Sequence, residues 1–423
     1  MYKFIIQGGK KLKGEVEISG FKNAAVAILP ASILAEETTI IDNLPDISDT
    51  RTLLNILESM GANVTRLEKN KVSIAPGTMK QCTADSDRSK DLRASYYFLG
   101  AGLGRFNKAK VAYPGGCHIG SRPIDQHIKG FEALGAKVKI DQGIISVQAR
   151  ELKGAKIYLD VVSVGATINI MLAAVKAKGQ TIIENAAKEP HIVDVASYLN
   201  CLGAKVKGAG TDTIKIEGVK KLGGCEHAII PDQIEAGTYM IAAAATHGDV
   251  VIKNVIPKHL ESITAKLKEM QVSIEEDGDQ IRVKAAKRTR SADIKTLVYP
   301  GFPTDLQQPM TSLLAISEGT GSITENIFEG RFKHVVELKR MGASIRVEGK
   351  VAIIEGVKKL SPATVKASDL RAGAALIIAA LSTRGKSEIH DIEHILRGYD
   401  HIENKLQGLG AEIEIINTER AEG

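Results

Sequence analysis

The sequence predicts an α/β protein of two domains, each built from three copies of one repeat. Three observations predict this fold class: a short string recurs six times along the chain, every copy contains a small apolar helix pattern, and strand patterns follow the helices. Six copies divide evenly into two groups of three, so we expect the domain boundary near residue 230. One long irregular α/β domain is the alternative.

The recurring string reads Leu/Met-Gly-Ala-x-Val/Ile. Intact copies occupy residues 60–64, 134–138, 202–206, 341–345 and 409–413, and a degraded copy occupies 270–274. The third positions advance by 74, 68, 68, 71 and 68 residues, so the copies cover the chain from end to end. A glycine after an amphipathic stretch commonly takes the left-handed conformation that ends a helix. Each string is therefore predicted to be a turn from a helix to a strand.

A second helix pattern in each repeat is small and apolar nearly all round. The six predicted segments are 24–35, 94–103, 166–177, 237–246, 307–318 and 372–381. A helix without a polar face must be buried, and its alanines and glycines allow neighbouring helices to approach closely. Each repeat is thus expected to combine strands with one buried and one amphipathic helix.

The composition indicates a globular protein that handles small anions. Hydrophobic residues make up 43% and charged residues 25%. The first ten residues contain no apolar stretch of signal-peptide length, and no window reaches the length of a membrane span, which predicts a cytoplasmic protein that binds no membrane. The net charge is +6, but basic residues are scattered, aromatics amount to 4% and Trp is absent. A nucleic-acid partner is therefore not expected, because no stacking platform or basic patch is evident.

Polar residues stand at the starts of the predicted buried helices. They are Lys22 and Asn23, Asp91 to Arg93, Ser163 to Gly165, Asp232 with Glu235, Thr304 and Asp305, and Asp369 to Arg371. The carboxylates have a structural interpretation as N-terminal caps. Lys22, Arg93 and Arg371 do not, because a cation is unfavourable at that end of a helix dipole. A bound phosphate or carboxylate would resolve the conflict.

A Gly-rich loop at 114–123 forms the second group of candidates. It contains Cys117, with Arg122 five residues later, and His118 between them. A nearby cation lowers the pKa of a thiol and makes Cys117 a candidate nucleophile or acid, and loops of this kind act as lids. A surface turn is the alternative. The other three cysteines, Cys82, Cys201 and Cys225, are expected to be inert free thiols, and no cysteine has zinc-ligand spacing.

Together the motifs resemble the enolpyruvyl transferase family over the whole chain, and the cysteine loop resembles the members that act on a UDP-amino sugar rather than on shikimate phosphate. The motifs are 20–25, 114–123 with Asp125 and His127, 163–167, Glu189 and Pro190 with Asp194, Pro231 and Asp232 with Glu235, 302–305, 369–372 and 397–399. The resemblance implies a two-domain inside-out α/β barrel. Six βαβαββ repeats would place helices inside and sheets outside. The implied domains are 22–230, and 1–21 plus 231–423, with the active site in a cleft between them.

The implied reaction moves the enolpyruvyl group of phosphoenolpyruvate to the 3-hydroxyl of UDP-N-acetylglucosamine by addition and elimination. It is the first committed step of peptidoglycan precursor synthesis, and it needs neither a metal nor an organic cofactor. The resemblance places Asp305 as the base and Cys117 as the acid and as the target of epoxides such as fosfomycin. Lys22 and Arg397 would stabilise the charge on phosphate.

The resemblance also assigns the substrate contacts. Lys22, Arg93, Arg122, Arg371 and Arg397 would bind phosphoenolpyruvate. The acceptor's contacts would be Asn23 for sugar and intermediate, Arg122, Pro123, Ile124, Asp125 and His127 for uridine, Ser163, Val164 and Gly165 for diphosphate, and Thr304, Asp305 and Ile327 for the amino sugar.

Two positions depart from the family pattern. Val161 stands where many relatives have a lysine, and Gly330 stands in a Glu-Gly-Arg run where relatives often have asparagine. Altered affinity rather than lost activity is expected. Two functional alternatives remain: the shikimate-pathway transferase, which needs no cysteine, and a non-catalytic protein that binds the sugar nucleotide.

Overall fold

The computed structural model describes residues 2–84, 92–113 and 123–417. These residues form two compact units. We call residues 20–113 with 123–230 lobe A, and residues 2–19 with 231–417 lobe B.

All six sheets of the described residues have four strands in one arrangement. An edge strand pairs in parallel with its neighbour, and two antiparallel pairings follow. In lobe A the sheets run β14-β3-β5-β4, β6-β7-β9-β8 and β10-β11-β13-β12. In lobe B they run β2-β15-β17-β16, β18-β19-β21-β20 and β22-β23-β1-β24. The identical pairing confirms that one supersecondary unit is repeated.

The strands are short, as expected for small sheets. Those of lobe A are β3 (Thr39–Asp42), β4 (Asn63–Glu68), β5 (Lys71–Ala75), β6 (Thr83–Ala84), β7 (Lys108–Ala112), β8 (Lys137–Asp141), β9 (Ile144–Gln148), β10 (Lys156–Tyr158), β11 (Gln180–Glu184), β12 (Lys205–Lys207), β13 (Thr213–Glu217) and β14 (Glu226–Ala228). Those of lobe B are β1 (Tyr2–Gly8), β2 (Lys13–Glu17), β15 (Asp249–Lys253), β16 (Ser273–Asp277), β17 (Gln280–Lys284), β18 (Ile294–Lys295), β19 (Thr320–Thr324), β20 (Ser344–Glu348), β21 (Val351–Glu355), β22 (Thr364–Lys366), β23 (Gly385–His390) and β24 (Glu412–Asn417).

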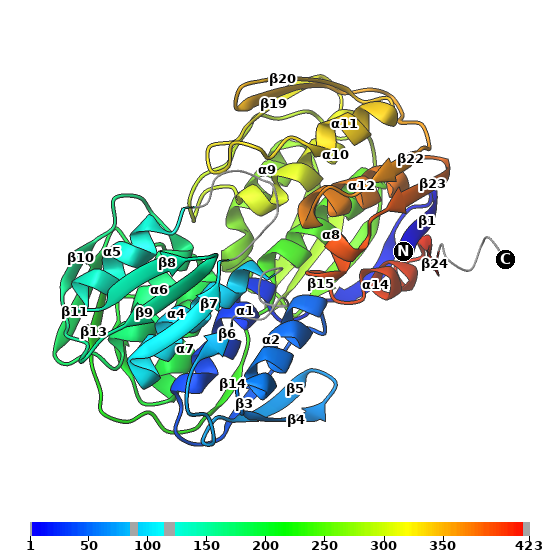
Figure 1. The fold of residues 1–423 in the computed structure, drawn as a ribbon. Coiled ribbons are helices and arrows are strands. Elements are labelled where there is room, and N and C mark those ends of the chain that lie inside the picture. The colour runs from blue at the N-terminus through cyan, green and yellow to red at the C-terminus, as the bar shows by residue number, and fades with distance from the viewer. Residues whose placement is uncertain (1, 85–91, 114–122, 418–423) are drawn as a thin grey trace. The chain divides into compact units, whose positions relative to one another are not determined.

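Three almost fully buried helices form the centre of each lobe. They are α1 (Lys22–Ala31), α4 (Tyr97–Phe106) and α6 (Val164–Ala174) in lobe A, and α8 (Gln233–Ala245), α10 (Gln307–Ile316) and α12 (Leu370–Ser382) in lobe B. Within each lobe these helices pack on one another, and the sheets lie around them (Figure 1). Because their side chains are apolar on every face, only the interior satisfies them. The predicted inside-out α/β fold is confirmed.

Each repeat also contains an amphipathic helix. They are α2 (Ser48–Ser59), α5 (Asp125–Ala133) and α7 (Pro190–Cys201) in lobe A, and α9 (Glu261–Glu269), α11 (His334–Arg340) and α14 (Ile402–Gly408) in lobe B. Shorter helical turns are η1 (Ser32–Leu34), η2 (Arg93–Tyr96), η3 (Pro257–Leu260), η4 (Thr304–Leu306) and α13 (Glu393–Leu396). The glycine of every intact string has a positive φ, between 86° and 101°, as the predicted helix-ending turn requires.

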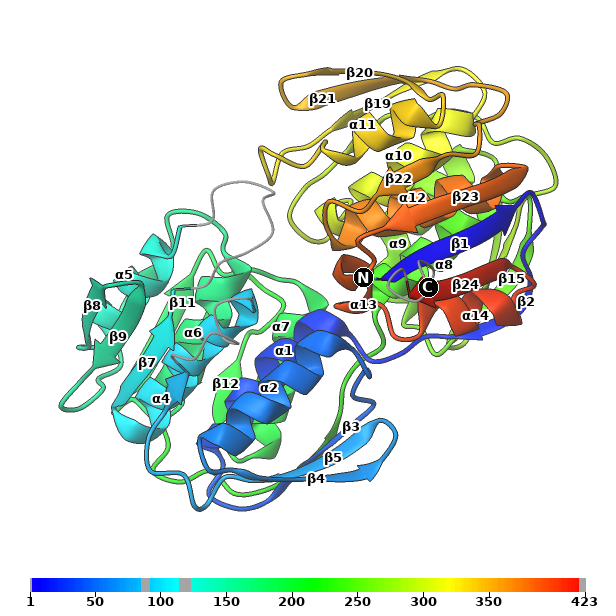
Figure 2. The same cartoon turned by 45° about the vertical axis from the view of Figure 1, so that its right-hand side comes forward.

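Three strands are supplied from a distant part of the chain. The sheet that follows α1 takes its parallel edge strand from β14, and the sheet that follows α8 takes its edge strand from β2. Strand β1 lies between β23 and β24 and completes the last repeat, as Figure 2 shows. Lobe A is thus one continuous stretch of chain, whereas lobe B needs both ends of it.

Candidate active site

Asp305 lies at the head of α10 in lobe B, between two guanidinium groups. Arg331 donates from Nη2 to Asp305 Oδ1 at 2.6 Å, and Arg371 donates from Nη2 to Asp305 Oδ2 at 3.2 Å. Both arginines are almost fully buried, while the Asp305 side chain is 26% exposed. The carboxylate is therefore not a helix cap. It is a fixed anion that is reachable from one side and compensates two buried cations.

Glu325 joins two residues that the sequence assigned to the amino sugar. Its Oε2 accepts a hydrogen bond from the Thr304 hydroxyl at 2.8 Å, and its Oε1 accepts from the Ile327 backbone N–H at 2.8 Å. Arg331 adds a bond from Nη1 to Thr304 Oγ1 at 3.0 Å. Glu325 is buried and follows β19, so it fixes Thr304 and Ile327 beside Asp305.

Arg371 lies in the first turn of α12 (Leu370–Ser382), where a cation opposes the helix dipole. The Asp369 side chain caps this helix by accepting from the Arg371 and Ala372 N–H groups at 2.9 and 3.0 Å. The guanidinium lies 5.3 Å from the centre of the Tyr399 ring, two residues beyond Arg397. Carboxylates and an aromatic face of the chain itself thus stabilise Arg371.

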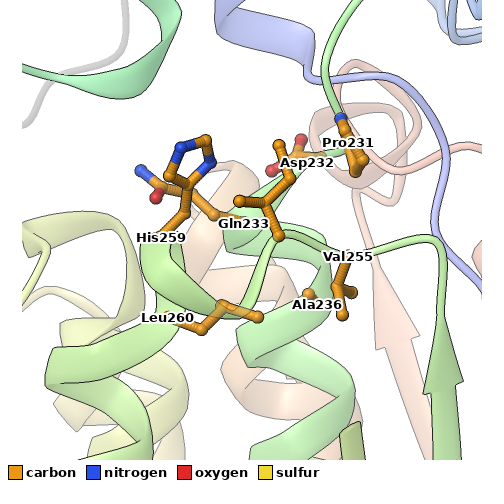
Figure 3. A pocket seen from close by; sticks show the side chains of 8 residues that line it. Pro231, Asp232, Gln233, Ala236, Val255, His259 and Leu260 are labelled. Carbon is orange, nitrogen blue, oxygen red and sulfur yellow. The ribbon is translucent and has the colours of Figure 1, made fainter. Parts of the chain in front are cut away.

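A small hollow at the head of α8 is lined by Asp232, Gln233, His259 and apolar side chains (Figure 3). Asp232 caps α8 through the N–H groups of Ile234 and Glu235 at 2.7 and 3.0 Å, so the capping interpretation holds for Asp232 as for Asp369. The hollow contains none of the predicted substrate contacts. It is a packing feature of the helix start.

Lys22 is the first residue of α1 in lobe A. Its ammonium group pairs with Asp49 Oδ2 of α2 at 2.5 Å, and both side chains are mostly buried. Asn23 follows on the same turn. The ring of Phe21, just before the helix, packs edge-on against His191 at 5.3 Å, which brings the start of α7 close to the start of α1. The chain thus supplies an anion for Lys22, as it does for Arg371.

The segments predicted to hold the nucleotide meet in lobe A. The Arg93 guanidinium lies 5.8 Å from the centre of the Tyr96 ring, and the Tyr96 ring lies 4.9 Å from that of His127. A Cβ added to Gly165 would lie 2.7 Å from Tyr96 Oη and 3.0 Å from His127 Cε1 and Nε2. Only glycine allows both rings to reach the start of α6, whose Ser163 side chain caps it by accepting from the Ala166 N–H at 3.3 Å.

His127 is held by buried Asn169. Asn169 Oδ1 accepts from the Gly100 backbone N–H at 2.9 Å, so its amide nitrogen faces His127 Nδ1 at 3.0 Å. An amide donates to that nitrogen only when it is unprotonated, so the remaining proton lies on Nε2. Burial, together with the charge of Arg93, lowers the pKa of His127 to about 3. His127 is therefore a neutral ring that carries its proton on Nε2, the nitrogen beside Gly165.

The remaining nucleotide candidates lie at the start of α5. Pro123 is exposed, Ile124 is buried, and Asp125 is the first residue of the helix. Gln126 donates to Asp125 Oδ2 at 2.8 Å and to Asp160 Oδ2 at 3.2 Å, which ties this helix to the segment before Ser163. Val161, in place of the family's lysine, is 59% exposed. Asp91, Cys117, His118 and Arg122 lie outside the described residues.

Metal sites and membrane spans each require a recognisable arrangement of side chains. Among residues 2–84, 92–113 and 123–417, no three His, Cys, Asp or Glu side chains are placed to hold a metal ion. No helix in that part of the chain has both the length and the apolar character needed to cross a bilayer.

Comparison with known proteins places the chain in a family. The model of the EPSP synthase (3-phosphoshikimate 1-carboxyvinyltransferase) family matches residues 6–406. The chain is an enolpyruvyl transferase. UDP-N-acetylglucosamine 1-carboxyvinyltransferase 2 of Clostridium acetobutylicum is 61% identical over 414 residues, which cover 98% of this transferase and 99% of that protein. The corresponding protein 3 of Caldanaerobacter subterraneus is 59% identical over 413 residues, with the same coverage.

Solved structures of other enolpyruvyl transferases share the fold. NikO from Streptomyces tendae superposes with a TM-score of 0.89 at 25% identity and covers 98% of each chain. EPSP synthase from Acinetobacter baumannii gives 0.76 at 20% identity and covers 99% of this transferase and 100% of that chain. The family predicted from the motifs is confirmed.

The sequence patterns did not identify several residues that hold the site residues of the transferase in position. Arg331 was noted only as the last residue of the Glu-Gly-Arg run and was given no role, yet it binds both Asp305 and Thr304. Glu325, Asn169 and Asp49 were not named at all. Each is a polar side chain buried beyond about nine-tenths and bonded to a predicted site residue. A polar residue at a position where the pattern predicts an apolar one was the available signal in the sequence. That signal does not show which residue the polar side chain contacts.

Proposed function

We propose that this transferase moves the enolpyruvyl group of phosphoenolpyruvate to the 3-hydroxyl of UDP-N-acetylglucosamine and releases phosphate, in the first committed step of peptidoglycan precursor synthesis. The likeness to UDP-N-acetylglucosamine transferases, at 59–61% identity over nearly the whole chain, carries the proposal. The sequence identity to EPSP synthase of Acinetobacter baumannii is 20%. Cys117 in its Gly-rich loop favours the same acceptor. We also propose that the reaction takes place in the cytoplasm.

The donor carries a carboxylate and a phosphate, so its site must supply several cations. Lys22, Arg93, Arg122, Arg371 and Arg397 fill this role in the proposal. Guanidinium forks bind both anionic groups with two parallel hydrogen bonds. Lys22 and Arg371 are already oriented by Asp49 and Asp305. The donor therefore meets cations whose side chains are already held in place, which lowers the entropic cost of binding it.

The acceptor is assigned to groups of both lobes. The proposed contacts are Arg122, Pro123, Ile124, Asp125 and His127 for uridine, Ser163, Val164 and Gly165 for diphosphate, and Asn23, Thr304, Asp305 and Ile327 for the sugar. A helix N-terminus with free backbone N–H groups favours phosphate, and α6 offers one at Ser163 to Gly165. The domains at 22–230 and 1–21 plus 231–423 stay a prediction, as does their closure around both substrates.

Asp305 is the proposed base for the sugar hydroxyl. A carboxylate bonded to two guanidinium groups is a weak proton acceptor, because both neighbours stabilise its anionic form. The 3.2 Å bond from Arg371 is the longer of the two, and the donor carboxylate competes for that arginine. Binding of phosphoenolpyruvate thus frees one oxygen of Asp305, while Arg331 at 2.6 Å keeps the other in place.

The remaining steps use the other catalytic candidates. Attack of the sugar oxygen on C2, with a proton delivered to C3 from Cys117, gives a tetrahedral ketal. Return of a proton from C3 to the Cys117 thiolate, with loss of phosphate from C2, then restores the double bond. Lys22 and Arg397 stabilise the charge that accumulates on the leaving phosphate. Neither step needs an electron acceptor or a metal.

Phosphate release from phosphoenolpyruvate with each acceptor tests the proposal. UDP-N-acetylglucosamine should support turnover, and shikimate 3-phosphate should not. Asp305→Asn keeps the shape and one hydrogen-bond acceptor but removes the base, so kcat should fall by about 10²-fold or more while nucleotide binding persists. Asp305→Ala should abolish turnover, and the surface variant Asp293→Ala is the control. Equal loss of binding and turnover in Asp305→Asn would contradict the role as base.

The alternatives give distinct results in the same assay. A non-catalytic sugar-nucleotide protein would bind the nucleotide and release no phosphate. A shikimate-pathway enzyme would turn over shikimate 3-phosphate and keep its activity in Cys117→Ser.

A further inference from the structure

Two of the cysteines expected to be inert lie together on lobe A. Cys201 is the last residue of α7, and Cys225 immediately precedes β14, 24 residues later in the chain. The Cys201 thiol donates to the backbone carbonyl of Glu226, the residue after Cys225, at 3.6 Å. The two thiols are close enough for Cys201 to influence the titration of Cys225. Both thiols interact with the buried Tyr198 phenol of α7.

The two thiols differ in exposure. Cys201 is exposed, whereas Cys225 is partly buried against Thr39, whose hydroxyl donates to the Cys225 carbonyl at 3.0 Å and lies 3.8 Å from its sulfur. Burial, with the neighbouring Cys201 thiol, raises the pKa of Cys225 to about 12. Cys201 is therefore the thiol that an oxidant in solution meets first, and Cys225 is the one placed to attack second.

The segments that carry the two thiols are already fastened to each other. His227 Nε2 of β14 lies 2.9 Å from Asp194 Oδ1 of α7, and the Ile230 N–H donates to Asp194 Oδ2 at 3.3 Å. Helix α7 and strand β14 are in contact. A covalent bond between Cys201 and Cys225 would therefore join two segments that already contact each other.

We propose that Cys201 and Cys225 form a reversible intramolecular disulfide, which makes this surface of lobe A a site of oxidative modification. The oxidant is a low-molecular-weight disulfide such as oxidised glutathione. The Cys201 thiolate attacks one of its sulfurs, forms a mixed disulfide and expels one thiol. The Cys225 thiol then loses its proton and attacks the Cys201 sulfur, which expels the second thiol; this is the slower step, because burial keeps Cys225 protonated. The protein loses two electrons and two protons, and the oxidant becomes two thiols.

A redox titration of the full-length Cys117→Ser variant tests this proposal, because only Cys82, Cys201 and Cys225 then remain. In buffers of rising oxidised to reduced glutathione ratio, the intact mass should fall by about 2 Da with the slope of a two-electron couple. Peptide mapping should find Cys201 linked to Cys225, and reductant should reverse the change. Buried Cys82 should stay reduced.

Variants decide between the disulfide and separate modification of each thiol. Adding Cys201→Ser should abolish the transition. Adding Cys225→Ser should leave a stable glutathione adduct on Cys201, and adding Cys82→Ser should change nothing. A stable adduct on Cys201 beside free Cys225 in the parent variant would overturn the proposal. A one-electron slope, or a transition that survives Cys201→Ser, would also overturn it.

Discussion

Asn169 shows how one buried amide sets the chemistry of a neighbouring ring. Its oxygen is committed to the Gly100 N–H in α4, so its nitrogen must face His127. The imidazole is thereby held neutral, with Nε2 protonated and directed to the start of α6. A hydrogen-bond donor with no titration near neutral pH suits recognition of an oxygen-rich ligand.

Asn169→Asp should reverse this arrangement. The carboxylate keeps the Gly100 bond but presents an acceptor to His127, which must then place a proton on Nδ1. The pKa of His127 should rise from about 3 toward neutrality. Imidazole ¹⁵N shifts measured against pH report both changes, with Asn200→Asp on α7 as a control. An Nδ1 signal that stays unprotonated would contradict the assignment.

Two buried histidines make stability depend on acid pH. Burial lowers the pKa of His334 to about 4 and that of His127 to about 3, from 6.5. Between the folded-state pKa values and 6.5, the unfolded chain binds protons that the folded chain excludes. The free energy of unfolding that these histidines contribute is therefore fully present above pH 6.5 and is lost as pH falls toward 4. His334→Leu should reduce the slope by about 1.4 kcal/mol per pH unit in that window.

Urea unfolding at several pH values measures this slope. Val336→Ala, on the exposed side of α11, removes no titratable group and is the matched control. An unaltered slope in His334→Leu would show that His334 exchanges its proton with solvent in the folded state.

Sequence motifs identified individual site residues better than the contacts between them. Asp305 and Arg371 were named from patterns at helix starts, but Arg331 lies 26 residues beyond Asp305, across β19. Its neighbours in sequence give no sign of its partner. The sequence around a carboxylate at a helix start also does not show whether it caps the helix or serves the site. Asp232 and Asp369 cap their helices, whereas Asp305, in the same kind of position, binds arginines.

At the scale of elements, the degraded repeat keeps the backbone geometry of the intact ones. Gln271 occupies the helix-ending position with φ of 67°, where the five intact strings have glycine. A side chain in the left-handed region costs about 1 kcal/mol relative to glycine. The turn in this repeat therefore forms because its surroundings impose it.

Gln271→Gly should stabilise lobe B by about 1 kcal/mol, since it removes this cost. Gly342→Gln, at φ of 89° with no atom within 4 Å of an added Cβ, is the reciprocal variant and should destabilise by a similar amount. Urea unfolding measures both. Destabilisation by Gln271→Gly would mean that the glutamine side chain contributes more than its backbone costs.

The helices themselves were predictable, and their ends were not. All six apolar segments are buried helices, because burial follows from composition around the whole circumference. The segment expected at 94–103 instead begins as the 3-10 turn η2 and continues as α4, and α8 begins at Gln233, four residues before the predicted start. Polar residues such as Asp232 set these ends, and apolar patterning does not detect them.

At the scale of the molecule, the edge strands that come from a distant part of the chain, β14 and β2, determine which part of the chain can fold alone. Residues 20–230 include β14 and hence every strand of the described sheets in lobe A. A fragment of residues 231–423 lacks β2 and also β1, which pairs with strands on both of its sides. The repeats could be recognised in the sequence. The distant origin of these edge strands could not, because β2 and β14 lie away from the recurring string.

We expect fragment 20–230 to unfold cooperatively in urea, and fragment 231–423 to lack a cooperative transition. Tyr2 lies opposite Asn417 in the antiparallel pair of β1 and β24, so a short turn can join residue 417 to residue 2. The rearranged chain 231–417, turn, 2–19 should recover the transition, which circular dichroism and urea unfolding measure. Cooperative folding of 231–423 alone would contradict the need for β1 and β2.

The central position of β1 also has a consequence for synthesis on the ribosome. This strand is translated roughly 20–80 s before its neighbour β24 at usual elongation rates. During that interval Phe4 and Ile6, which are fully buried in the finished protein, have no native sheet to cover them. The nascent chain thus carries an apolar strand that stays without its native neighbour until β24 has left the ribosome.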